Sequence, residues 1–161
     1  MLAAVVVLGS ILVVSLGDTG IGSASRGSEP LRDVSTVRLQ RTGARWHLTK
    51  NGEPYLIKGA GGDGDRALLV RSGANSIRTW GADNLGEVLD RAHKEGLMVT
   101  AGIWIGHVGQ FNYADAKAVE EQFSMCRDVV RRYKNHPALL MWAFGNEAEG
   151  DGMQDSVWRA I

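Results

Sequence analysis

The chain has 161 residues, of which 44% are hydrophobic and 22% charged, a composition that excludes a disordered tail and is typical of one globular domain. Its 18 Lys and Arg residues balance 18 Asp and Glu residues, and no basic block interrupts the sequence. We therefore expect no nucleic-acid partner, because binding to phosphate backbones requires clustered positive charge.

The N-terminal segment, residues 1–24, has the pattern of a secretory signal peptide. Residues 1–16 are almost all Leu, Ala, Val and Ile, and the small residues that follow favour cleavage after Ala24. The apolar run is shorter than the roughly 20 residues that cross a bilayer, so we predict no stable membrane span. The first basic residue is Arg26, so the positive start of most signals is absent. The sequence predicts a secreted or periplasmic protein, with residues 25–36 as a polar linker.

Folding is predicted to begin near Val37 with a short β-hairpin lead-in, because Val37–Leu39 and Trp46–Leu48 alternate apolar and polar residues. Asn51-Gly52 then marks a tight turn. From there, strands and helices alternate. The predicted strands cover residues 55–58, 76–80, 97–104 and 138–144, and the predicted helices cover residues 65–72, 84–95 and 115–133. Short loops between them imply parallel strands joined by right-handed crossovers, which is the α/β class.

Two helices have clear apolar faces. For the second helix, Asn84 and Glu87 predict a capping box. The residues expected to be buried on this helix are Leu85, Val88, Leu89 and Ala92. The stripe expected on the third helix is Val119, Phe123, Cys126, Val130 and Tyr133. The single cysteine of the chain is therefore predicted to be a core residue without chemistry.

The last predicted strand favours a closed barrel over an open doubly wound sheet. Leu140, Trp142 and Phe144 form a bulky face that suits packing under helices, whereas Met141, Ala143 and Gly145 form a face that tapers, as the crowded interior of a barrel requires. The predicted fold is thus a partial (β/α)8 TIM barrel containing strands one to four. Glu147 falls on the tapering, inward face.

A glycine-rich segment offers a competing interpretation. Gly59, Gly61 and Gly64 satisfy the G-x-G-x-x-G spacing of dinucleotide-binding loops, and Asp83 follows about twenty residues later. Acidic residues at positions 63 and 65 oppose this interpretation, because they place negative charge where a pyrophosphate would bind. No cofactor is therefore expected. The four histidines lack the spacing of metal ligands, so no metal site is expected either.

Asn146 and Glu147 follow the last strand directly, at the end where barrel enzymes carry catalytic groups. Strict alternation would point the two side chains in opposite directions, so a twist or bulge is required there. The simpler alternative is a polar turn.

Four runs in a fixed order resemble glycoside hydrolase family 2 and its relatives in the same barrel clan: KNGEPYLIKG (50–59), NSIRTW (75–80), GIWIGH (102–107) and YKNHPALLMWAFGNE (133–147).

The resemblance covers about residues 46 to 150 and implies a role for each matching position. Glu147 corresponds to the general acid/base, and Asn146 to the residue that hydrogen-bonds the sugar 2-hydroxyl. Arg78 corresponds to the arginine that positions the nucleophile, with a structural ion pair as the alternative. His107 is expected to line the sugar pocket or to lie on a surface loop. Trp80 and Trp104 are expected to stack on sugar rings or to be core residues.

The implied activity is hydrolysis of O-glycosidic bonds in an oligo- or polysaccharide by a retaining mechanism. The resemblance also implies a nucleophile on strand seven, which this sequence does not contain. Residues 37–161 are therefore expected to be the truncated N-terminal half of a barrel, inactive alone and with exposed apolar sheet edges. The alternatives are a non-catalytic carbohydrate-binding remnant and a nucleotide-dependent oxidoreductase. The sequence predicts no oligomeric state.

Overall fold

The structure is a computed structural model that describes residues 34–148. The predicted signal peptide and most of the predicted linker lie outside the described residues. Within the described range, no helix is both long and apolar enough to span a bilayer.

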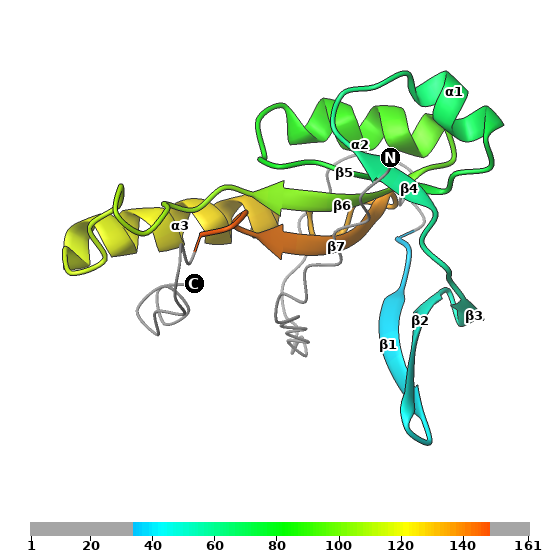
Figure 1. Cartoon of the computed structure of the whole chain (residues 1–161), viewed down its shortest axis with the longest axis horizontal. Helices are drawn as coiled ribbons and strands as arrows, with labels where there is room; N and C mark the ends of the chain where they lie inside the picture. Colours follow the sequence, from blue (N-terminus) through cyan, green and yellow to red (C-terminus); the bar gives the residue numbers. More distant parts are fainter. Residues whose placement is uncertain (1–33, 149–161) are drawn as a thin grey trace, which may run out of the picture. The chain divides into compact units, whose positions relative to one another are not determined.

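Two sheets organise the described part of the chain (Figure 1). The first is antiparallel and contains β1 (Val37–Thr42), β2 (Arg45–Lys50) and β3 (Glu53–Pro54). The second is parallel, in the order β4 (Gly59–Gly61), β5 (Ser76–Arg78), β6 (Met98–Ile103) and β7 (Leu139–Phe144). Three helices connect its strands: α1 (Arg66–Arg71), α2 (Leu85–Lys94) and α3 (Ala116–Tyr133).

The order of the parallel strands decides between the two predicted architectures. Each strand pairs with the next one in the sequence, and no strand is skipped or inserted out of turn. A doubly wound sheet reverses its order at a switch point, whereas a barrel adds strands in one direction. The predicted α/β class and partial (β/α)8 barrel are confirmed.

The core lies between the parallel sheet and the helices. The larger of two apolar clusters joins α2 to the sheet through fully buried Leu89, Ala92, Val99 and Ala101. The predicted buried face of α2 is therefore confirmed. Asn84 is the N-cap residue as predicted, but the predicted capping box is wrong, because Asn84 has a left-handed backbone (φ 53°) and its side chain makes no capping hydrogen bond.

The stripe predicted on α3 is wrong at one position. Phe123 is exposed, with the Arg127 guanidinium lying 5.8 Å from its ring centre, and the neighbouring Gln122 is buried instead. The helical period places residues 119, 122, 126 and 133 on one side, so the polar residue comes to the core and the aromatic one does not. Cys126 is buried as predicted, and burial raises the pKa of its thiol.

The faces of β7 follow the prediction beyond its first residues. Met141 and Ala143 pair across from Thr100 and Gly102, while Trp142 packs on the helix-side clusters. The expected place of Leu140 on the helix side is wrong, since a register shift near the start of the strand brings Leu139 into that cluster.

The first predicted strand of the barrel is displaced along the chain. Residues 55–58 form no strand, and β4 begins only at Gly59. The cause is Asn75, whose side chain donates to Leu56 O and accepts from Lys58 N, each at 2.8 Å. These backbone groups are therefore satisfied by a side chain and not by a neighbouring strand.

Candidate active site

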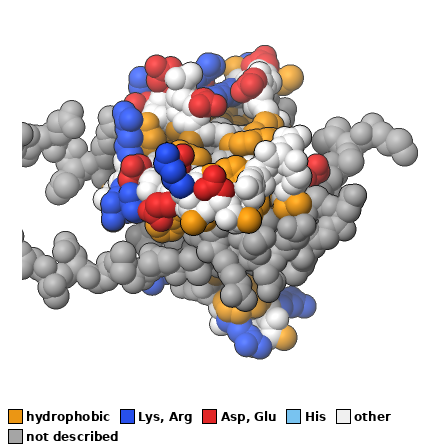
Figure 2. Space-filling model, turned by 90° about the vertical axis from the view of Figure 1, so that its left-hand side faces the viewer, with side chains coloured by type: hydrophobic (Ala, Val, Ile, Leu, Met, Phe, Trp, Pro, Cys, Tyr) orange, Lys and Arg blue, Asp and Glu red, His pale blue; other side chains and the backbone are white. Residues whose placement is uncertain are grey.

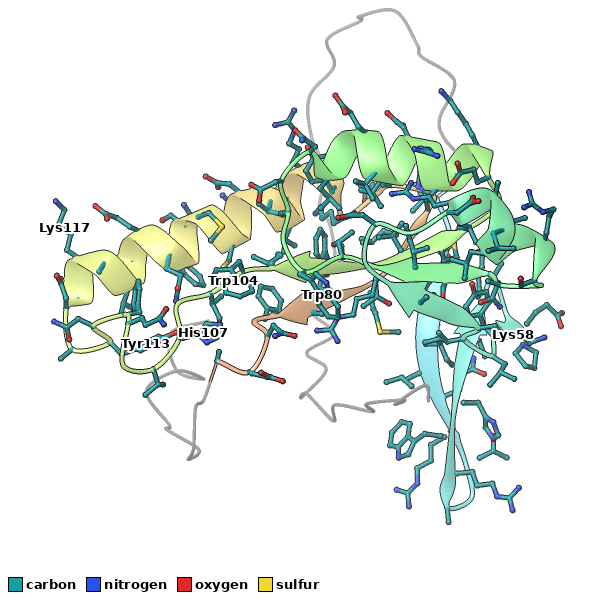
Figure 3. The ribbon with its side chains drawn as sticks, turned by 45° about the horizontal axis from the view of Figure 1, so that its top comes forward. Lys58, Trp80, Trp104, His107, Tyr113 and Lys117 are labelled. Carbon is teal, nitrogen blue, oxygen red and sulfur yellow. The ribbon has the colours of Figure 1, made fainter. Side chains whose placement is uncertain are left out.

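The residues proposed for catalysis gather at the carboxyl ends of β5, β6 and β7. Figure 3 shows Trp104, His107 and Tyr113 close together beyond β6, whereas Lys58 lies at the opposite end of the sheet. Figure 2, which views the molecule from the side to which the strands point, shows hydrophobic side chains at the surface among acidic and basic ones.

Arg78 joins two of the predicted site residues. Its Nη2 donates to Asn146 Oδ1 at 3.4 Å, and its Cζ lies 4.2 Å from the ring centre of Trp80. The contact with Trp80 is a cation–π interaction, which orients the guanidinium. Its Nε is buried and has no hydrogen-bond partner among the described residues. Since no carboxylate pairs with Arg78 in this part of the chain, the alternative of a structural ion pair receives no support there.

The backbone turns sharply where β7 ends. Gly145 has φ +70° and its N–H donates to Ile103 O at 2.8 Å, so the ladder with β6 continues to this point. Glu147 also has a positive φ, +52°, which is unfavourable for a residue with a side chain. Its side chain is exposed, while Ala148 is 2% exposed. The twist required at the strand end is present, and the chain holds Glu147 in it against local preference.

Trp104 and His107 form a pair on the loop after β6. Their rings are stacked, with centres 4.9 Å apart and planes 25° from parallel. Trp104 is 50% exposed and Trp80 is 46% exposed, so the alternative that these are core residues is wrong. His107 is half-buried, and its Nε2 is buried without a hydrogen-bond partner in the described range. The pair combines an exposed aromatic face with a buried polar nitrogen that has no partner among the described residues.

The sequence analysis assigned no role to the four residues that hold this loop, Gly106, Val108, Tyr113 and Gln122. Gly106 donates its N–H to Gln122 Oε1 at 2.7 Å and accepts a hydrogen bond from the Tyr113 hydroxyl. Val108, which follows His107, donates its N–H to Ala148 O at 3.0 Å. The polar Gln122 on the apolar side of α3 was the signal that could have revealed this arrangement.

The glycine-rich segment has a packing role. Gly59 lies in β4 so close to Ser76 that a side chain on it would overlap the Ser76 backbone. Gly61 lies under the Trp80 ring, which would be only 3.0 Å from a Cβ at that position. These glycines allow strand pairing and the placement of Trp80, so their spacing needs no nucleotide to explain it.

Nothing in residues 34–148 brings three or more His, Cys, Asp or Glu side chains together as metal ligands. The thiol of Cys126 lies in the apolar cluster with Ile103, Ile105 and Ala148, directly beneath the turn. Because burial raises its pKa, it stays protonated at neutral pH and is a poor nucleophile. The chemistry available at this end of the sheet is that of a carboxyl, an amide, a guanidinium and an imidazole.

A parallel sheet that adds its strands in one direction and carries a carboxyl, a guanidinium and exposed aromatic rings at its carboxyl end is typical of part of a (β/α)8 barrel with its functional end. Comparison with known proteins agrees. Residues 63–160 match the family described as glycosyl hydrolases family 2, TIM barrel domain. The chain belongs to this family and represents part of its barrel domain.

Named relatives are glycoside hydrolases. The chain is 31% identical to a β-glucuronidase of Paenibacillus borealis over 71% of this chain and 23% of the relative. It is 30% identical to the β-glucuronidase of Sus scrofa over 78% of this chain and 22% of the relative. β-Mannosidase A of Emericella nidulans is 28% identical over 73% of this chain and 14% of the relative. The chain thus spans less than a quarter of the length of these curated relatives.

Solved structures share the fold. A β-glucuronidase from Ruminococcus gnavus in complex with D-glucaro-d-lactam superposes with a TM-score of 0.58 at 21% identity, covering 78% of this chain and 23% of that one. The β-D-glucuronidase of Dictyoglomus thermophilum gives a TM-score of 0.53 at 24% identity, covering 78% and 26%. With a hydrolase family matched, the interpretation of the glycines as a nucleotide-binding loop is abandoned.

Proposed function

We propose that the protein carrying this chain hydrolyses β-O-glycosidic bonds in carbohydrates with retention of configuration, and that Glu147 is its general acid/base. One observation supports this most strongly. Glu147 is held in an unfavourable backbone conformation at the carboxyl end of β7, between Asn146, which is hydrogen-bonded to Arg78, and Ala148, which is hydrogen-bonded to Val108. Such strain is typical of functional positions.

In the proposed reaction, the Glu147 carboxyl donates its proton to the glycosidic oxygen as the bond to the leaving group breaks. A second carboxylate attacks the anomeric carbon and forms a covalent glycosyl-enzyme. Glu147, now a carboxylate, then removes a proton from the water that releases the sugar. The second carboxylate comes from a part of the protein outside this chain, as the greater length of the relatives suggests.

Arg78 would position that second carboxylate and keep it ionised. Its buried Nε has no partner among the described residues, and a buried donor left unpaired costs about 1–3 kcal/mol. A carboxylate accepting from Nε would remove this cost, and the positive charge would favour the ionised form of the nucleophile. Asn146, fixed by Arg78 on one side, would present its amide to a sugar hydroxyl.

Trp104, His107 and Trp80 would bind the sugar. Exposed tryptophan faces suit the C–H faces of pyranose rings, and His107 would line the pocket beside Trp104, on which it is stacked. A non-catalytic carbohydrate-binding remnant would need these aromatic groups but not Glu147.

We also propose export, directed by residues 1–24. N-terminal sequencing of the protein recovered from outside the cytoplasm would then begin at Ser25.

The test is Glu147→Gln in the full protein as its gene encodes it, assayed as kcat/KM, which reports bond cleavage in the first step. For alkyl β-glycosides, which leave poorly without a proton, we expect kcat/KM to fall by about 10²–10⁴-fold. For dinitrophenyl glycosides, which need no protonation, the fall should be far smaller. Glu53→Gln, at an exposed position on β3, is the matched control and should change neither.

Equal losses on both substrates would overturn the acid/base assignment. Sugar binding without turnover in the unchanged protein would instead favour the carbohydrate-binding remnant.

A further inference from the structure

We propose that Gln122 and Tyr113 are positioning residues that set the place of Glu147 through the loop after β6. The inference rests on the proposed function, because it concerns how the same carboxyl is held. It assigns a role to two residues that never touch the substrate in this scheme and that lie on α3 and on the loop before it.

The two side chains hold one residue from both sides. Gln122 Oε1 accepts from the Gly106 N–H at 2.7 Å, and the Tyr113 hydroxyl donates to the Gly106 carbonyl. Gly106 also lies against Phe111, whose side chain occupies the space that a Cβ would need. Phe111 is in turn packed on Tyr113, with ring centres 4.7 Å apart. The peptide groups before and after the Gly106 Cα are therefore both held in place.

Contacts on either side of Gly106 carry this constraint to the turn that bears Glu147. Before it, Ile105 is 1% exposed and lies against Gly145, where a Cβ would be 2.9 Å from Ile105 Cγ1. After it, Val108 N–H donates to Ala148 O at 3.0 Å. The first and last residues of the turn, 145 and 148, are thus both in contact with the segment that Gln122 and Tyr113 hold.

Burial of Gln122 in the core is unfavourable for stability. It is 8% exposed on the apolar side of α3, and its Nε2 is buried without a hydrogen-bond partner in the described part of the chain. A half-satisfied buried amide is less favourable for stability than an apolar side chain of the same size. What the amide provides, and an apolar residue would not, is a fixed acceptor for Gly106.

The chain offers a matched control for the Tyr113 hydroxyl. Tyr55 also donates its hydroxyl to a backbone carbonyl, that of Asn75, at 2.7 Å. This hydrogen bond lies at the amino-terminal end of the parallel strands, away from the candidate active site. Tyr113→Phe and Tyr55→Phe therefore remove the same chemical group from the same type of bond at opposite ends of the sheet.

The experiment compares Tyr113→Phe, Gln122→Met and Tyr55→Phe in the full protein. For alkyl β-glycosides we expect kcat/KM to fall about tenfold in the first two variants, because a misplaced acid transfers its proton poorly. For dinitrophenyl glycosides the fall should stay below about threefold, since no proton is needed. Tyr55→Phe should lower the melting temperature without changing the ratio between the two substrates.

The inference is overturned if both site variants behave as Tyr55→Phe does, losing only stability, or if they lower both activities equally. Glu147→Gln, measured beside them, separates this from failure of the proposed function. If Glu147→Gln shows the selective loss and the positioning variants do not, only the inference fails. If Glu147→Gln shows no selective loss, the proposed function itself fails.

Discussion

At the amino-terminal end of the parallel sheet, Asn75 uses nearly every polar group it has. Its side chain bonds Leu56 O and Lys58 N, and its backbone oxygen accepts from Tyr55 and from Met98 N. At the carboxyl end, Arg78 Nε and His107 Nε2 are buried without partners among the described residues, and Glu147 has a positive φ. Asn75 thus satisfies its own polar groups, whereas at the carboxyl end two side chains keep buried nitrogens without partners in the described range.

This difference indicates which end of the sheet contributes more to stability and which contributes more to activity. A satisfied network costs stability when it is cut, because each remaining partner is left unpaired. A site that already contains strain and unpaired donors loses less stability on mutation and more function. Substitutions at the two ends should therefore separate the two properties.

Among substitutions that leave Glu147 in place, the largest effect is expected for Arg78→Lys. A lysine keeps the charge but lacks the planar fork, so it cannot both bond Asn146 and offer a second donor to a carboxylate. We expect kcat to fall by about 10²-fold with little change in melting temperature. Arg71→Lys, at an exposed position on α1, is the control and should leave kcat unchanged. Full activity of Arg78→Lys would contradict the assigned role.

Asn75→Ala should give the opposite result. Removing the side chain breaks two exposed hydrogen bonds, to Leu56 O and Lys58 N, which we expect to lower the free energy of unfolding by about 0.5–1.5 kcal/mol. Urea unfolding of the full protein measures this loss. Because the change lies at the end away from Glu147, kcat/KM of the folded variant should stay within about twofold of the original value. A selective loss of activity on alkyl glycosides would contradict the claim that this end of the sheet contributes to stability and not to activity.

The smallest effect is expected for Trp104→Ala. The ring is half exposed and stacked on His107, so its loss should raise KM about tenfold and leave kcat nearly unchanged. Trp46→Ala is the matched control, since Trp46 is 63% exposed on β2 and has Arg41 above its ring. An equal rise in KM in both variants would show that the effect is not local to the site.

The sequence was a good guide wherever one local signal dominates. The apolar period of α2 is as expected, because the spacing of apolar residues acts within one helix. The candidate site was located through the family resemblance, and the structure brings Arg78 to Asn146 across 68 residues of sequence.

The differences arise where long-range contacts override local pattern. Asn75 binds the backbone groups of Leu56 and Lys58, within the segment 55–58 that the sequence predicts as a strand. The side chain of Gln122 is buried because it meets Gly106, sixteen residues away, and no helical periodicity predicts that partner. The positive φ of Glu147 could not be predicted from the sequence, because it depends on how residues 145 and 148 are held.

The most direct test of the account is azide rescue of Glu147→Ala in the full protein, with an activated aryl β-glycoside as substrate. Without Glu147, the covalent glycosyl-enzyme lacks a base to activate water, whereas azide attacks without one. We predict that azide restores kcat and that the product is the β-glycosyl azide, with the configuration of the substrate retained. No rescue, or an α-glycosyl azide, would contradict the assignment of Glu147 as the acid/base of a retaining hydrolase.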